Sequence, residues 1–152
     1  MSSIESTVTA PATTKVGGIH PAAAPAIGFG IYLIAVVLGL ALDASADTEA
    51  EQNFTDWAFT ILIALVGLGV AWWASARAAS RGTMARTSLI LGVVAVVTIV
   101  GFWTGFPCVF GAAAIALGLG ARQHPGAQGP AVAGILLGAL ALAFGAFIMV
   151  VG

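Results

Sequence analysis

The chain consists of long apolar blocks separated by short polar stretches. Blocks without a charged residue cover 25–42, 57–76 and 131–151. Each is close to the roughly 20 residues that an α-helix needs to cross a hydrocarbon core about 30 Å thick. The pattern therefore predicts an all-α integral membrane protein, built as a bundle of transmembrane helices.

A further apolar block, residues 88–121, fits two architectures. As one straight helix its roughly 34 residues would measure about 51 Å, which exceeds the hydrocarbon core. As a hairpin broken at 105–107, it gives two arms of about 15 strictly apolar residues, which 84–86 and 122–124 can extend as helix. Pro107 lacks a backbone donor and Gly101 and Gly105 loosen the chain, so either a turn or a kink is feasible here. Five spans (25–42, 57–76, 86–103, 108–123 and 131–151) and four spans both remain open at this point.

The distribution of charge favours five spans. With a cytoplasmic N-terminus, five spans place every Lys and Arg inside, as the positive-inside rule expects, whereas four spans would place Arg122 and His124 outside. The basic residues are Lys15, Arg77, Arg81, Arg86 and Arg122. The loop 43–56 carries only acidic charge, lacks the glycine turn of a calcium loop, and is predicted to be a solvated outer loop. We therefore predict a plasma-membrane protein with a cytoplasmic N-terminus and an outer C-terminus.

The tryptophans agree with this orientation. Trp57 and Trp103 fall at the outer boundary, and Trp72 and Trp73 fall at the inner one, as in the aromatic belts of membrane proteins.

Residues 1–24 are rich in Ser, Thr, Ala, Pro and Gly, which predicts a disordered cytoplasmic tail before a transmembrane domain at 25–152. Small residues near Ala46 follow an apolar stretch in the manner of a signal-peptidase site. The lead before that stretch contains Glu5 and a single Lys, unlike a short basic signal sequence. We expect the first span to be retained.

Composition excludes several classes of protein. Only 7% of the residues are charged and 60% are apolar, whereas a soluble protein carries about 25% charged residues. A net charge of −1 argues against a nucleic-acid partner. The single cysteine, Cys108, cannot form an internal disulfide or a CxxC site, and it is predicted to be a small buried apolar residue.

Candidate chemistry is sparse. No Asp, Glu, Lys, Arg or His lies in the interior of a predicted span, which argues against proton-coupled transport, haem ligation and intramembrane proteolysis. The hydroxyls at depth are those of Tyr32, Thr60, Thr98 and Thr104, and the threonines are expected to bond to their own helix backbone. His20 and His124 would make a poor two-ligand metal site. We therefore predict no catalytic residue, metal or cofactor.

Small residues supply the positive signal. Gly134, Gly138, Ala141 and Gly145 share one face of the last span, and Gly111 and Gly118 lie two turns apart in the fourth, near Ala114 and Ala121. Such faces let helix backbones approach closely in lipid. They can serve packing within the chain, or a surface for a partner or a second copy. The arginines, besides setting topology, are able to attract anionic headgroups.

Three segments resemble a known family. They are SLILGVVAVVTIV, GFWTGFPCVFGAAAIALGLGARQ and GPAVAGILLGALALAFG. Over residues 87–151 the chain is similar to small actinobacterial multi-spanning membrane proteins with a C-terminal domain of unknown function. The resemblance implies a hairpin plus a third helix and no catalytic residue, although Arg122 stands alone where the family has a basic cluster.

Two functions are consistent with these features. The first is a non-catalytic accessory or scaffold subunit of a plasma-membrane complex. The alternative is a passive channel or small-solute transporter formed by a homo-oligomer on the glycine faces. The expected partners are the lipid bilayer and either another membrane protein or further copies of the chain.

Overall fold

The computed structural model describes the backbone of residues 20–43 and 50–151, and the side chains of these residues except 21, 40–43, 50–57 and 102. Residues 1–19 of the predicted disordered tail and the cleavage site at Ala46 lie outside the described residues. The side chain of Trp57 and those of the acidic loop do so as well. Residues 21–24 are helical, so the predicted tail boundary at 24 is wrong.

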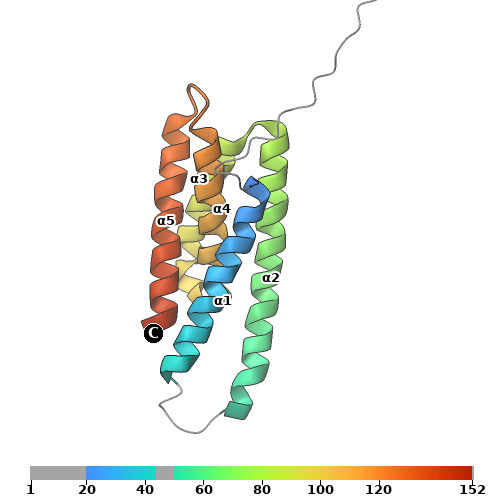
Figure 1. The fold of residues 1–152 in the computed structure, drawn as a ribbon, viewed down its shortest axis with the longest axis vertical. Coiled ribbons are helices and arrows are strands. Elements are labelled where there is room, and N and C mark those ends of the chain that lie inside the picture. Colours follow the sequence, from blue (N-terminus) through green and yellow to red (C-terminus); the bar gives the residue numbers. More distant parts are fainter. Residues whose placement is uncertain (1–19, 44–49, 152) are drawn as a thin grey trace, which may run out of the picture.

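The described chain is all-α, as predicted. It contains five α-helices and two short 3-10 helices, η1 and η2, which precede α1 and follow α3 (Figure 1). In chain order the elements are η1 Pro21–Ala23, α1 Ala24–Asp43, α2 Ala50–Arg81, α3 Met84–Val97, η2 Thr98–Thr104, α4 Phe106–Ala121 and α5 Gln128–Val151.

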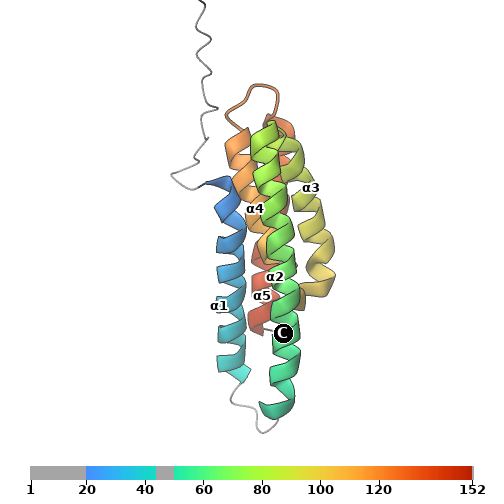
Figure 2. The same cartoon turned by 90° about the vertical axis from the view of Figure 1, so that its right-hand side faces the viewer.

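The helices run up and down along one axis, with α4 in the middle (Figures 1 and 2). Twelve of the 16 residues of α4 are buried, and α4 contacts α1, α2, α3 and α5. The most extensive contacts join α3, α4 and α5, and α2 lies at the edge of the bundle. The main core cluster accordingly centres on α4, at Val109, Phe110 and Leu117.

The block 88–121 turns back on itself, so α3 and α4 form a hairpin. The predicted tip at 105–107 is confirmed at Gly105 and wrong for Phe106 and Pro107, which already belong to α4. The helix distorts at Gly101 (φ −104°, ψ 45°), and the reversal is completed at Gly105, whose φ of +71° favours glycine. Pro107 already lies in the first turn of α4, where its missing N–H costs no helical hydrogen bond.

The ends of α3 and α4 lie a few residues away from the ends of the predicted spans. Helix α3 begins at Met84, so the predicted extension of the first arm is confirmed. The predicted extension of the second arm to 124 is wrong, because α4 ends at Ala121 with Arg122 as its C-cap. The chain then turns through Gly126, at φ +83°, into α5.

Three helical segments are long and apolar enough to cross a membrane: Ala58–Arg81, Met84–Gly101 and Gln128–Val151. Two further apolar segments, Ala24–Gly39 and Phe106–Ala121, are shorter. The length of α4 is about 24 Å at 1.5 Å per residue, which is less than the hydrocarbon core.

Candidate functional site

The glycine faces of α4 and α5 meet directly. A methyl group on Gly111 would lie 2.6 Å from the Gly138 carbonyl oxygen, and one on Gly138 would lie 2.6 Å from the Gly111 carbonyl oxygen. Only the absence of both side chains permits this approach of backbone to backbone. Packing of this kind stabilises helix association where lipid provides no hydrophobic driving force.

Helices α3, α4 and α5 also approach one another closely toward the end of the bundle where Arg86 and Arg122 lie, and a serine hydroxyl takes part in this contact. Ser88 on α3 is fully buried, and its Oγ donates a hydrogen bond of 2.7 Å to the Ala114 carbonyl oxygen on α4. A methyl group on Gly118 would lie 2.7 Å from the Ala131 carbonyl oxygen, and one on Gly134 would overlap Ser88. Three helices therefore meet around one serine.

At the other end of α5, Gly145 packs against the start of α4. A methyl group there would lie 2.9 Å from Pro107 Cβ. Cys108 lies alongside and is 2% exposed, which confirms its prediction as a buried residue. All five predicted glycines, Gly111, Gly118, Gly134, Gly138 and Gly145, thus face neighbouring helices of the same chain.

Helix α1 closes over the α3 and α4 turn. Tyr32 is fully buried, and its ring fills the space that a side chain at Gly105 would occupy. The Tyr32 hydroxyl donates a hydrogen bond of 3.4 Å to the Trp103 carbonyl oxygen. Gly28, one turn earlier, lies against the Cys108 carbonyl group.

Hydroxyls also bond the backbone of this turn. Thr98 Oγ1 donates to the Ala95 carbonyl oxygen over 2.9 Å, and Thr104 Oγ1 donates to that of Gly101 over 2.7 Å. These two hydrogen bonds confirm the prediction for both threonines. They matter because backbone groups without a partner are costly in lipid.

Sequence reasoning missed the inner face of α2. Its buried residues are Ala64, Gly67, Ala71, Ser75 and Ala78. Their spacings of three and four are the available signal, but alanine is too common in this chain to make the stripe stand out. Ser75 is fully buried and its hydroxyl has no hydrogen-bond partner among the described residues.

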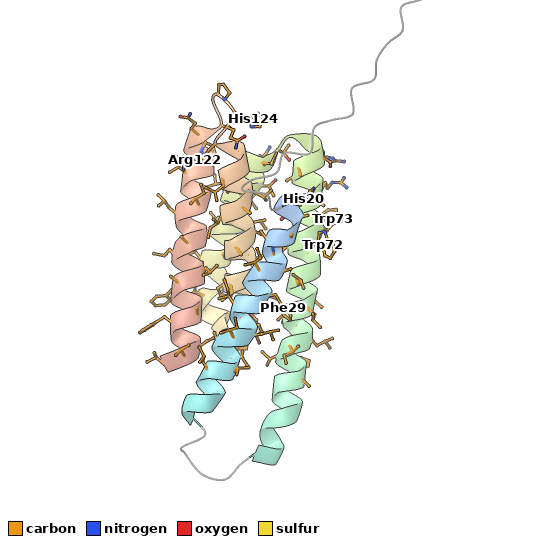
Figure 3. All side chains as sticks on the ribbon, viewed as in Figure 1. His20, Phe29, Trp72, Trp73, Arg122 and His124 are labelled. Carbon is orange, nitrogen blue, oxygen red and sulfur yellow. The ribbon has the colours of Figure 1, made fainter. Side chains whose placement is uncertain are left out.

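All the described basic side chains gather at one end of the bundle. Arg122, His124 and His20 lie there with Trp72 and Trp73 (Figure 3), and the turn from α2 to α3 brings the remaining three arginines to the same end. These are Arg77, Arg81 and Arg86. None of the described side chains is a carboxylate, so the four arginines, all exposed, have no acidic partner among them.

Two polar contacts order this arginine end. The Arg77 guanidinium lies over the Trp73 ring, 5.1 Å from its centroid. His20 Nδ1 accepts a hydrogen bond from the Ala22 backbone N–H over 3.2 Å, next to the start of α1. The described residues contain no cluster of three or more His, Cys, Asp or Glu able to hold a metal ion.

No protein-family model, no curated protein and no solved structure matches this chain. The resemblance of residues 87–151 to the actinobacterial membrane proteins therefore stays a prediction.

Proposed function

We propose that this chain is a non-catalytic plasma-membrane protein that crosses the bilayer five times and serves as an accessory or scaffold subunit of a larger membrane complex. Its N-terminus lies in the cytoplasm and its C-terminus outside. The single observation that carries the proposal is the central position of α4, held on several sides by close helix contacts.

The burial of α4 supports five crossings despite its short length. A helix of about 24 Å that faced lipid would leave backbone groups of the adjoining turn in hydrocarbon. Here the turn packs under Tyr32, and hydroxyls bond its carbonyl groups. Protein therefore replaces lipid around the short helix.

The separation of charge supports the orientation. The arginines share one end of the bundle, whereas Asp43 ends α1 and Glu51 and Asp56 lie near the start of α2, at the opposite end (Figure 1). With the arginine end in the cytoplasm, the positive-inside rule is satisfied. Trp103, which is 53% exposed, then lies toward the outer boundary.

The contents of the interior support a structural role. The closest contacts among α3, α4 and α5 are made by glycine, alanine and one serine, and apolar side chains such as Leu91, Val109 and Leu117 fill the space between these helices. The interior of the predicted spans contains no Asp, Glu, Lys, Arg or His to move a proton or bind an ion, since Arg86 and Arg122 lie at span ends. An interior of this composition supports close helix packing, which is what a structural subunit requires.

The alternative of a homo-oligomeric channel needs glycine faces between copies of the chain. In the structure those faces pack within one chain. The exposed faces of α2 and α5 instead carry bulky residues such as Leu62, Val66, Leu136 and Phe147. This difference favours the accessory role.

Purification through a C-terminal affinity tag in a mild detergent tests the proposed role. We expect a different membrane protein to co-purify in stoichiometric amount, and a tagged five-span protein of similar size serves as the control for non-specific capture. Recovery of a homo-oligomer that supports solute flux in liposomes would overturn the accessory role.

Helix α1 is also expected to stay in the mature protein. It packs closely against the bundle through its backbone. A methyl group on Gly39 would lie 2.6 Å from the Met149 carbonyl oxygen of α5. The purified protein should have an intact mass near 15.1 kDa. A mass reduced by the segment up to Ala46 would show that α1 is removed.

A further inference from the structure

We propose that the outer face of α2 binds one anionic phospholipid, with its phosphate on Arg77 and Arg81 and an acyl chain along the apolar residues that precede them. This proposal rests on the membrane orientation given above and is independent of any protein partner. The face, named here the α2 lipid face, consists of Leu62, Val66, Val70, Trp73, Arg77 and Arg81.

These six residues form one continuous stripe. They recur at spacings of three and four, which places them on the same side of a helix. All are exposed, and Val66 and Trp73 are 61% and 63% exposed. On the opposite side of α2, Ala71 and Ser75 face the bundle, so the stripe points away from the protein.

The length of the stripe matches one leaflet. From Val66 to Arg77 the helix rises about 16 Å at 1.5 Å per residue. Half of a hydrocarbon core about 30 Å thick is about 15 Å. When Val66 lies near the bilayer centre, about midway between the predicted boundary residues Trp57 and Trp73, Arg77 therefore reaches the depth of the headgroups.

The headgroup end of the stripe is ordered before any lipid binds. The Trp73 ring supports the face of the Arg77 guanidinium at 5.1 Å, a cation–π contact. Stacking leaves the edge of the guanidinium free, and its planar N–H donors match the geometry of a phosphate. Arg81 follows one helical turn later and adds a second positive charge.

The charge around this face is complementary to an anion. None of the described side chains is a carboxylate, so none competes with a phosphate for Arg77 or Arg81. A free phosphate ion would use only the two arginines. A phospholipid also covers the exposed apolar residues beneath them, which is why we assign the face to a lipid.

Native mass spectrometry of the full-length protein in detergent tests this proposal, with phosphatidylglycerol and phosphatidylcholine of identical acyl chains as probes. We expect phosphatidylglycerol to bind more tightly. Arg77→Gln should weaken that binding about five-fold, the factor that corresponds to about 1 kcal/mol for one arginine near the surface.

Arg86→Gln is the matched control, because it removes the same charge from the same end but lies on α3, away from the Trp73 stack. It should change phosphatidylglycerol binding by less than about two-fold. Equal losses in both variants would overturn the proposal, because they would show attraction to the arginine end as a whole.

Two further variants test the stacked geometry. Arg77→Lys keeps the charge and Trp73→Leu keeps Arg77, yet both should lower the preference for phosphatidylglycerol if the ring orders the guanidinium. Displacement of the lipid by millimolar inorganic phosphate would overturn the role of the acyl chain. These measurements use the purified chain alone, so their outcome does not depend on whether a protein partner co-purifies.

Discussion

Helices α4 and α2 are both apolar, yet one forms the centre of the molecule and the other its edge. Helix α4 meets its neighbours through glycines and alanines on almost every side, and Gly111 brings its backbone against that of Gly138 on α5. Helix α2 has one small-residue stripe, whose single close glycine, Gly67, lies against the ring of Phe106. A methyl group on its Gly69 would meet no other part of the protein within 4 Å.

This difference shows what decides position in a bundle when the solvent is lipid. Apolarity alone cannot sort the helices, because lipid tails are as apolar as leucine. The number of faces on which a helix can be approached closely does sort them. Helix α4 has several such faces and α2 has one.

The largest expected effect comes from filling a close contact of α4. Gly111→Leu would force a side chain into the Gly138 carbonyl group, 2.6 Å from the first added carbon, and should lower the free energy of unfolding by about 3 kcal/mol. Gly69→Leu on α2 adds the same side chain where no other part of the protein lies, and should change the free energy of unfolding by less than about 1 kcal/mol. Unfolding in detergent, followed by helical circular dichroism, measures both. Similar losses in the two variants would contradict a central α4.

The turns that begin α4 and end α2 give a smaller contrast. Gly105 and Gly82 have nearly the same backbone, with φ +71° and +67°. Alanine at either site should cost about 1 kcal/mol from backbone strain. At Gly105 the methyl group would also lie 2.8 Å from the Tyr32 ring, so we expect a total of about 2–3 kcal/mol there. Equal costs at both sites, in the same unfolding measurement, would show that Tyr32 does not pack on the turn.

The smallest contrast concerns two buried serines. Ser88→Ala removes the hydrogen bond to the Ala114 carbonyl oxygen of α4 and should cost about 0.6–1.7 kcal/mol. Ser75→Ala, on α2, removes a buried hydroxyl that has no partner among the described residues, so stability should hold or rise slightly. Thermal unfolding of the two variants side by side measures the difference. A larger loss for Ser75→Ala would reverse the comparison.

Patterns within one segment predicted much of this architecture. Apolar length indicated the helices, the excess length of 88–121 together with the charges indicated a hairpin, and glycine spacing marked the faces of α4 and α5. These properties depend on residues close in sequence. The glycine spacing did not say which helix each face would meet, since that requires the register of separate helices.

The rest depends on contacts between distant segments. The reversal ends at Gly105 beside Tyr32, a residue from another helix. The glycines and the proline placed the turn within 105–107, but they could not show that Tyr32 packs on it. Ser88 and Ser75 look alike in sequence, and only the position of α4 gives one of them an acceptor. The central position of α4 was not predicted, although Gly111 and Gly118 marked one of its close-packing faces.

The number of crossings is tested most directly by finding on which side of the membrane two positions lie, one at each end of α5. Gln123→Cys lies at the arginine end and Val151→Cys lies at the last described residue of α5. Cys108 is buried and adds little background. With an impermeant maleimide on intact cells, five spans predict labelling at 151 and labelling at 123 only after permeabilisation. The reverse pattern, with 123 labelled outside and 151 protected, would contradict the hairpin and restore a single crossing by residues 88–121.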